Sequence, residues 1–134
     1  MLFRSARLHD VLPQADFVAL TCPLTPETEK LIDAKALAAM KPTASLINVA
    51  RGRVVDEAAL VDALTRKVIA GAAVDCAWDE PLPASSALWR APDIFITPHT
   101  AGETQRYEDN VLDLLEENLA RLWRGEGELK NGVV

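Results

Sequence analysis

Three scarcities in the sequence exclude several classes of protein. Only two of the 134 residues are cysteines, and Cys22 and Cys76 match no metal-binding or redox spacing, so we expect a reduced, cytoplasmic protein without a metal site. No apolar run approaches the roughly 20 residues that a membrane-spanning helix needs, and the apolar start is too short for a signal peptide. Acidic residues outnumber basic ones by 20 to 14, and the net charge of −6 argues against a nucleic-acid partner.

Glycine is also scarce, and its spacing bears on the fold. None of the six glycines falls into the G-x-G-x-x-G turn that holds a pyrophosphate after the first strand of many α/β sheets. The hydrophobic content of 49% is enough for one ordinary core. Because no linker or repeat interrupts the chain, residues 1–134 are predicted to form a single domain.

Short apolar runs alternate with amphipathic segments along the chain. Strands are predicted at residues 16–21, 45–50, 68–74 and 94–97, the first of them buried on both faces of a sheet. Helices are predicted at 8–12, from a cap at Asp33 to 41, from a cap at Asp56 to 67, and at about 103–124. The last helix carries an apolar stripe and precedes an extended tail; the stripe comprises Tyr107, Val111, Leu115, Leu119 and Leu122. This alternation predicts a three-layer α/β fold with a parallel sheet of about four strands and flanking helices.

The segment after the first predicted strand allows two interpretations. Thr25 is a good helix N-cap, Pro26 suits a first helical turn, and Glu27 complements the positive end of a helix dipole. The free N–H groups of such a helix start could hold part of an anionic or ribose-bearing ligand. A plain capped turn fits the same residues equally well.

Polar residues follow three of the predicted strands. Arg51 ends the run at 45–50, Asp75 follows the run at 68–74 with Glu80 five residues on, and His99 follows the run at 94–97. Each has an ordinary structural explanation when taken alone. Since the carboxyl ends of parallel strands meet at one edge of a sheet, we expect the four side chains to share a site there.

An arginine beside a histidine–carboxylate pair suits chemistry on small organic acids. A guanidinium binds a carboxylate through two parallel hydrogen bonds. An imidazole held by a carboxylate is oriented to give a proton to a carbonyl oxygen or to take one from a hydroxyl. Hydride transfer needs a cofactor, because no side chain supplies a hydride.

Four motifs occur in a fixed order: P-L-T-P-E-T at 23–28, I-N-V-A-R-G at 47–52 with Val55-Asp56, G-A-A-V-D at 71–75 with D-E-P at 79–81, and T-P-H at 97–99. In order and spacing they resemble the C-terminal part of the nucleotide-binding domain of the D-isomer-specific 2-hydroxyacid dehydrogenases. The surroundings of Leu82-Pro83 and Leu88-Trp89 are similar to the glyoxylate/hydroxypyruvate reductase branch. The resemblance implies a partial Rossmann-like fold in which the first half of the domain is missing.

The resemblance also implies roles for matched positions. Arg51 would bind the substrate carboxylate, His99 would be the acid/base, Glu80 its partner, and Asp75 would face the nicotinamide carboxamide. Val49, Ala50 and Gly102 would line the nicotinamide site of NAD or NADP. The segment from Cys22 to Glu27 would pass near the ribose on the adenosine side of the cofactor, through Cys22, Pro23, Leu24, Thr25 and Glu27. The substrate would be a small 2-oxo or 2-hydroxy acid.

Family members also carry a substrate domain, the glycine turn and the acid that selects NAD or NADP. We find none of these in the sequence, and half a cleft cannot orient two reactants. We therefore expect weak cofactor binding and little turnover from this polypeptide by itself.

The sequence allows more than one partner for the first strand and more than one class of function. The strand at 17–20 would have an unpaired edge, which predicts a homo-oligomer formed there, or coverage by the C-terminal helix. A non-catalytic oligomerising domain that inherited the motifs is the main alternative to a dehydrogenase domain. A nucleotide-dependent transferase fits less well, because it leaves Arg51 and the His99–Glu80 pair unexplained.

Overall fold

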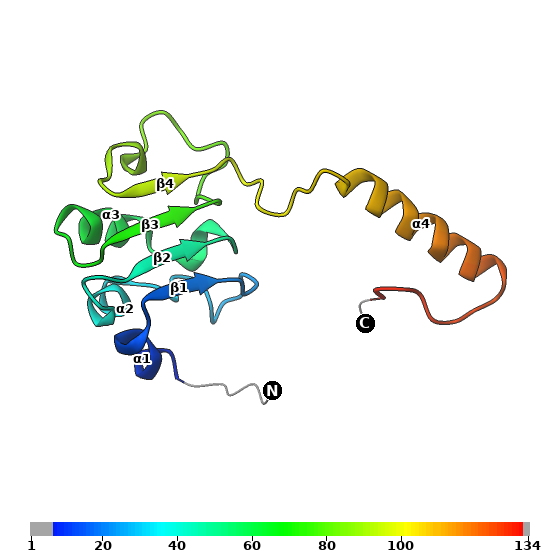
Figure 1. The fold of residues 1–134 in the computed structure, drawn as a ribbon, viewed down its shortest axis with the longest axis horizontal. Coiled ribbons are helices and arrows are strands. Elements are labelled where there is room, and N and C mark those ends of the chain that lie inside the picture. The colour runs from blue at the N-terminus through cyan, green and yellow to red at the C-terminus, as the bar shows by residue number, and fades with distance from the viewer. Residues whose placement is uncertain (1–6, 133–134) are drawn as a thin grey trace. The chain divides into compact units, whose positions relative to one another are not determined.

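The computed structural model describes residues 7–132, and the chain divides after Ala101 into two compact units (Figure 1). The first unit holds the strands β1 (Phe17–Leu20), β2 (Ser45–Asn48), β3 (Gly71–Val74) and β4 (Ile94–Ile96). It also holds the helices α1 (Leu8–Val11), α2 (Ala34–Ala39) and α3 (Glu57–Thr65), and the 3₁₀ turns η1 (Leu12–Gln14), η2 (Gly52–Val54) and η3 (Ala87–Arg90). The second unit holds α4 (Tyr107–Trp123).

The four strands form one parallel sheet in the order β1-β2-β3-β4 (Figure 1). Phe17 is aligned with Ser45, and Ser45 with Gly71, so neighbouring strands begin at the same level. The predicted α/β class with a parallel sheet of four strands and flanking helices is confirmed. All four carboxyl ends lie at one edge of the sheet.

Two aspartates begin the helices that connect the strands. The Asp33 carboxylate accepts a hydrogen bond from the Ala36 amide at 2.8 Å, and the Asp56 carboxylate accepts one from the Ala59 amide at 3.2 Å. These bonds satisfy amides that a helix start leaves unpaired, so both predicted caps are confirmed. Lys67, at a φ of 56°, turns the chain out of α3 toward β3.

The core lies between α2, α3 and one face of the sheet. Leu46 and Val74 from the strands pack with Leu37, Leu60 and Leu64 from the helices, and all five are almost completely buried. Both helices lie on this face because successive right-handed crossovers in one direction place their helices on the same side.

The opposite face of the sheet is open in the described part of the first unit. Phe17 in β1 is 71% exposed and Phe95 in β4 is 66% exposed, and Ala19, two residues after Phe17 in β1, is also exposed. The prediction that the first strand is buried on both faces is therefore wrong. A second helical layer is not formed by the described residues of this unit.

Other boundaries differ from the predicted ones. The residues after Thr25 form a hydrogen-bonded turn, so the capped turn is confirmed and the helix interpretation is wrong. Strand β3 begins at Gly71 rather than at 68. The tail after Gly125 is not simply extended, since the Asn118 side chain accepts from the Lys130 amide at 2.8 Å and donates to its carbonyl at 3.2 Å. The end of the predicted tail, residues 133–134, lies outside the described residues.

The second unit is dominated by α4. Gly125, at a φ of 73°, ends the helix as predicted. The predicted apolar stripe is present but is not buried within its own unit; its members are Tyr107, Val111, Leu115, Leu119 and Leu122. In residues 7–132, no helix has the length and apolar character needed to cross a bilayer.

Candidate functional site

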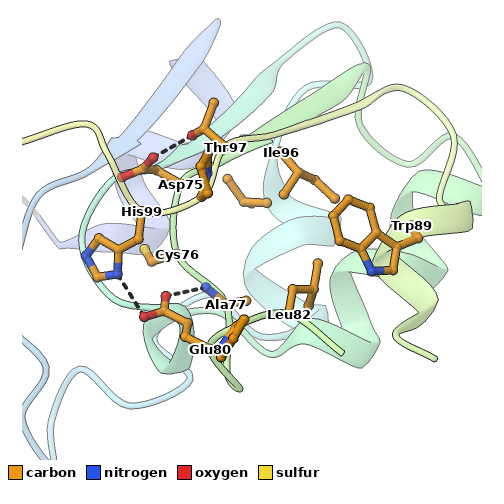
Figure 2. Close-up of a pocket in the computed structure, with 12 residues that line it drawn as sticks. Asp75, Cys76, Ala77, Glu80, Leu82, Trp89, Ile96, Thr97 and His99 are labelled. Atoms are coloured by element: carbon orange, nitrogen blue, oxygen red, sulfur yellow. Dashed lines mark hydrogen bonds and ion pairs between the residues drawn. The ribbon is translucent and has the colours of Figure 1, made fainter. Parts of the chain in front are cut away.

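The predicted polar residues meet at the carboxyl edge of the sheet. Arg51 lies three residues past the end of β2, Asp75 directly follows β3, and His99 lies three residues past β4. Figure 2 shows Asp75, Glu80 and His99 grouped around the same end of the sheet. The sequence-based expectation of a shared edge is met for these elements.

His99 and Glu80 form a hydrogen-bonded pair. The distance from His99 Nδ1 to Glu80 Oε2 is 2.8 Å, and both side chains are 40% exposed. The second Glu80 oxygen, Oε1, accepts from the Ala77 amide at 3.0 Å, so the carboxylate is fixed by two partners. The other ring nitrogen of His99 points away from Glu80 (Figure 2). The geometry orients one imidazole nitrogen toward the carboxylate and leaves the other for a ligand.

The charge of Glu80 is stabilised by its surroundings. The hydrogen bond with His99 holds the pKa of the Glu80 carboxyl below its usual value, and the Ala77 amide and the positive charge of Arg51 act in the same direction against the effect of burial. Arg51 is thus close enough to influence Glu80 electrostatically. At neutral pH, Glu80 is a carboxylate and a hydrogen-bond acceptor only.

Arg51 is presented by a turn that Asn48 organises. The Asn48 side chain accepts from the Ala50 amide at 3.1 Å and donates to the Arg51 carbonyl at 3.0 Å, and Asn48 is only 1% exposed. The Arg51 guanidinium donates to the Ala50 carbonyl at 2.6 Å. Within residues 7–132, no carboxylate forms an ion pair with Arg51, so the charge is open to an anionic ligand.

Gly52 joins the Arg51 turn to the loop that carries Glu80. A Cβ atom on Gly52 would lie 2.0 Å from the carbonyl carbon and oxygen of Ala77, and 2.6 Å from the Trp78 nitrogen. Only a residue without a side chain permits this approach of two backbones. Since Ala77 also donates to Glu80, the close contact couples the position of Arg51 to that of the His99–Glu80 pair.

A shallow hollow beside Arg51 gathers five of the predicted cofactor residues. It has a volume of about 550 Å³, and its lining comprises Thr21, Cys22, Pro23, Leu24, Val49, Ala50 and Arg51. Thr25 and Glu27 lie in the turn that follows and do not line it, and Gly102 belongs to the second unit.

Two further hollows follow along the same edge. One, of about 270 Å³, is lined by residues that include Val49, Asp75 and Thr97. The other, of about 340 Å³, adjoins the His99–Glu80 pair and is walled mainly by apolar side chains such as Leu82 and Trp89 (Figure 2).

The Asp75 carboxylate is engaged by the loop after β4. Its Oδ1 accepts from the Thr97 hydroxyl and, at 2.9 Å, from the Thr100 amide, while Oδ2 accepts from the Ala101 amide at 2.9 Å. Asp75 is 5% exposed. The implied contact of Asp75 with a nicotinamide carboxamide stays a prediction. In the structure, its carboxylate accepts hydrogen bonds from residues of the protein.

Cys76, next to Asp75, behaves as a buried apolar residue. Burial raises the pKa of its thiol to about 11, and the negative charges of Glu80 and Asp75 add to this. At neutral pH the thiol is therefore protonated, and it is a poor nucleophile.

Sequence reasoning assigned no role to Asn48, Gly52 or Thr97, although all three lie within the quoted motifs. An amide at the end of an apolar strand was a usable signal, because a buried Asn must find hydrogen-bond partners. The need for Gly52 depends on a backbone 25 residues later in the chain, which the local sequence does not reveal.

The residues present fit one side of a dinucleotide rather than a whole one. The hollow beside Arg51 mixes apolar side chains with backbone groups, which suits a flat, partly polar ring and its ribose. A pyrophosphate cradle of the glycine-rich kind is absent from the sequence. Among residues 7–132, no three His, Cys, Asp or Glu side chains are grouped to hold a metal ion.

Comparison with known proteins identifies relatives of this chain. Residues 1–101 match the family model described as "D-isomer specific 2-hydroxyacid dehydrogenase, NAD binding domain". Glyoxylate/hydroxypyruvate reductase B of Pectobacterium carotovorum is 41% identical over 123 residues, which cover 92% of this chain and 38% of that protein. Glyoxylate reductase of Pyrococcus furiosus is 41% identical over 119 residues, covering 89% of this chain and 35% of that protein.

Solved structures agree with these matches. The structure of a D-isomer specific 2-hydroxyacid dehydrogenase from Xanthobacter autotrophicus, in complex with NADPH and MES, matches this chain with a TM-score of 0.82 and 40% identity. The match covers 95% of this chain and 51% of that chain. The NAD-complexed D-isomer specific 2-hydroxyacid dehydrogenase from Lactobacillus delbrueckii matches with a TM-score of 0.85 and 33% identity. This match covers 96% of this chain and 43% of that chain.

The chain spans about two fifths of the length of the curated relatives it matches. The suggested likeness to glyoxylate/hydroxypyruvate reductases is confirmed by the relatives' names. On the strength of the family match over its first 101 residues, the chain belongs to the D-isomer specific 2-hydroxyacid dehydrogenases, and its first unit corresponds to their NAD-binding domain.

Proposed function

We propose that this chain provides the nicotinamide side and the catalytic edge of a 2-oxo acid reductase. The observation that carries the proposal is the 2.8 Å bond between His99 and Glu80 at the same sheet edge as Arg51, which forms no ion pair within residues 7–132. The names of the relatives, glyoxylate and hydroxypyruvate reductases, support a small 2-oxo or 2-hydroxy acid as the substrate class.

Each residue has a role that follows from its chemistry. The Arg51 guanidinium holds the substrate carboxylate and fixes its orientation through paired hydrogen bonds. His99 gives a proton to the carbonyl oxygen during reduction and takes it from the hydroxyl during oxidation. Glu80 holds the imidazole in one orientation through its bond to Nδ1.

A nicotinamide cofactor, NAD or NADP, supplies or accepts the hydride when it is bound. Cys22, Pro23 and Leu24 would form one wall of its site, and Val49 with Ala50 the other. The sequence lacks the glycine turn, so we propose that the chain alone binds the cofactor weakly and turns over little. Both cysteines are free, which fits the reducing cytoplasm that we propose as its compartment.

Titration with NADH and NADPH, followed by assay with glyoxylate and hydroxypyruvate, tests this function. We expect weak but measurable cofactor binding and turnover far below that of an intact reductase. Oxamate, an unreactive 2-oxo acid analogue, should bind in the presence of cofactor, and Arg51→Gln should weaken that binding about tenfold or more because the charge-assisted pair is lost. Arg66→Gln is the matched control, since the exposed Arg66 caps the C-terminal end of α3, away from the edge.

The outcomes separate the two candidate functions. Turnover equal to that of an intact reductase would refute the proposed weakness of the isolated chain. Absence of cofactor binding, or oxamate binding that Arg51→Gln leaves unchanged, would favour the non-catalytic oligomerising domain.

We also propose that the chain forms homo-oligomers through the free edge of β1 or through the apolar stripe of α4. Strand β1 pairs with β2 alone in the described sheet, and unpaired strand edges attract other strands. Sedimentation velocity over a range of concentrations should reveal a dimer that Phe17→Lys weakens, because a charge beside the edge opposes pairing. If Phe17→Lys has no effect and Leu115→Lys dissociates the dimer, the helix is the interface. A monomer at every concentration would contradict both.

A further inference from the structure

We propose that Asp75 is a positioning residue for His99: its carboxylate holds residues 97–101 in the turn that presents the imidazole to Glu80. The inference rests on the proposed role of His99 as the acid/base and deepens it. It assigns Asp75 a task other than binding the cofactor.

The donors to Asp75 lie on both sides of His99 in the chain. Thr97, two residues before the histidine, donates its hydroxyl to Oδ1, and the amides of Thr100 and Ala101, just after it, donate to Oδ1 and Oδ2 at 2.9 Å each. A carboxylate has roughly four acceptor positions, so most of its capacity is used by this loop. One side chain thus ties down both flanks of the histidine.

The backbone at His99 needs such support. His99 has a φ of 60°, in the left-handed region that a residue with a side chain rarely adopts. It follows Pro98, which has no N–H to donate, and strand β4 has already ended at Ile96. The loop therefore cannot be held by the sheet ladder alone, and the carboxylate of Asp75 supplies the missing acceptor.

Asp75 is itself anchored to the sheet. Its amide donates to the Asn48 carbonyl at 2.9 Å, and the Thr97 amide donates to the Val74 carbonyl at 3.0 Å. The residue sits at the junction of β2, β3 and β4 and is almost completely buried. The backbone of Asp75 is therefore fixed by the sheet, and its carboxylate offers the loop a fixed point of attachment.

The ionised state of Asp75 suits this task. Burial by itself would raise the pKa of the carboxyl, but the hydrogen bonds from Thr97, Ala101 and Thr100 outweigh it, with help from the charge of His99, and hold the pKa below its usual value. At neutral pH, the group is a carboxylate that only accepts. An amide in its place would present a donor to the Ala101 amide.

Asp75→Asn in the full chain tests the proposal without a substrate. We expect hydrogen exchange at the Thr100 and Ala101 amides to accelerate about tenfold, since a bond to a charged acceptor is lost. We also expect the NMR signal of the His99 Nδ1 proton, which reports the bond to Glu80, to broaden or disappear. A role limited to general stability would leave this signal intact in the folded protein.

Two further variants keep the test decisive. Asp79→Asn is the matched control, because Asp79 lies in the same loop as Glu80 and makes no side-chain hydrogen bond within the described residues; both readouts should stay as in the wild type. Thr97→Val removes one of the three donors to Asp75, so it should accelerate amide exchange and weaken the His99 signal, but less than Asp75→Asn does. If Asp75→Asn does not fold, Thr97→Val replaces it as the test.

A folded Asp75→Asn or Thr97→Val protein with unchanged exchange and an unchanged His99 signal would overturn the proposal. Neither readout involves a 2-oxo acid or a cofactor. A chain that binds no oxamate but loses the His99 signal in Asp75→Asn would therefore overturn the proposed function and leave this inference standing.

Discussion

Replacing Gly52 with alanine is expected to destabilise the first unit by about 3 kcal/mol or more, at the upper end of what overpacking usually costs. The new Cβ would stand 2.0 Å from the carbonyl carbon and oxygen of Ala77. These are backbone atoms, so no flexible side chain can move aside. Relief requires the η2 turn to separate from the 77–80 loop, which carries Glu80.

Urea unfolding followed by circular dichroism measures this loss. The midpoint for Gly52→Ala should fall with little change in the slope, since the surface exposed on unfolding is nearly the same. Gly127→Ala is the matched control, because no heavy atom lies within 4 Å of a Cβ at that position. Equal midpoints for Gly52→Ala and the wild type would show that the two loops can separate at no cost, and the coupling of Arg51 to Glu80 would be refuted.

Asn48→Ala is expected to cost about 2 kcal/mol, because it leaves the Ala50 amide without a partner, at about 1–3 kcal/mol, and removes one of two hydrogen bonds to the Arg51 carbonyl. The Ala50 amide donates to the Asn48 side chain, which is 1% exposed, while the Arg51 carbonyl accepts from that side chain and also from the Val54 amide at 3.1 Å. The turn that presents Arg51 should loosen at the same time. Oxamate binding in the presence of cofactor should therefore weaken in the folded variant.

The same urea experiment measures the stability of Asn48→Ala. Gln14→Ala is the control, since the Gln14 amide makes one exposed bond, to the Asp10 carbonyl, and its loss should cost little. Asn48→Asp probes the two bonds separately: it retains an acceptor for the Ala50 amide but cannot donate to Arg51. If Asn48→Ala were as stable as Gln14→Ala, the turn would not depend on this amide.

Much of the fold was predictable because its signals are local. Asp33 and Asp56 stand directly before helical patterns, and the bonds they make reach only three residues ahead. The apolar runs that became β2 and β4 have strand length and end in Arg51 and His99, so the shared edge followed from parallel pairing alone.

The failures arose where distant segments decide the backbone. After Thr25 the local sequence allows a helix, but the Lys30 amide donates to the Arg53 carbonyl at 2.8 Å and the Ile32 amide to the Val54 carbonyl at 3.1 Å. These bonds to a remote segment draw the chain away from a helix after a single turn. Likewise, the composition of β1 indicates a strand but cannot say whether one face or both will be covered.

The residues of the candidate site could be predicted from the sequence, but the hydrogen bonds that hold them could not. Residue type and strand position were enough to place Arg51, Glu80 and His99 together. The partners of Asp75 could not be read from the sequence, because two of them are backbone amides about 25 residues away, in a loop whose course depends on a left-handed histidine. Every residue except proline has a backbone N–H group, so residue types do not reveal which of these groups will bind the carboxylate.

Every strand of the sheet pairs only with strands adjacent to it in the sequence. During synthesis, β2 can therefore be added to β1, then β3, then β4, and among the strands of residues 7–132 none has to be inserted between earlier ones. Each addition closes a single crossover, which keeps its entropic cost modest. Because His99 follows β4, we expect β1, β2 and β3 to be paired before the segment that carries the His99 imidazole can dock against them.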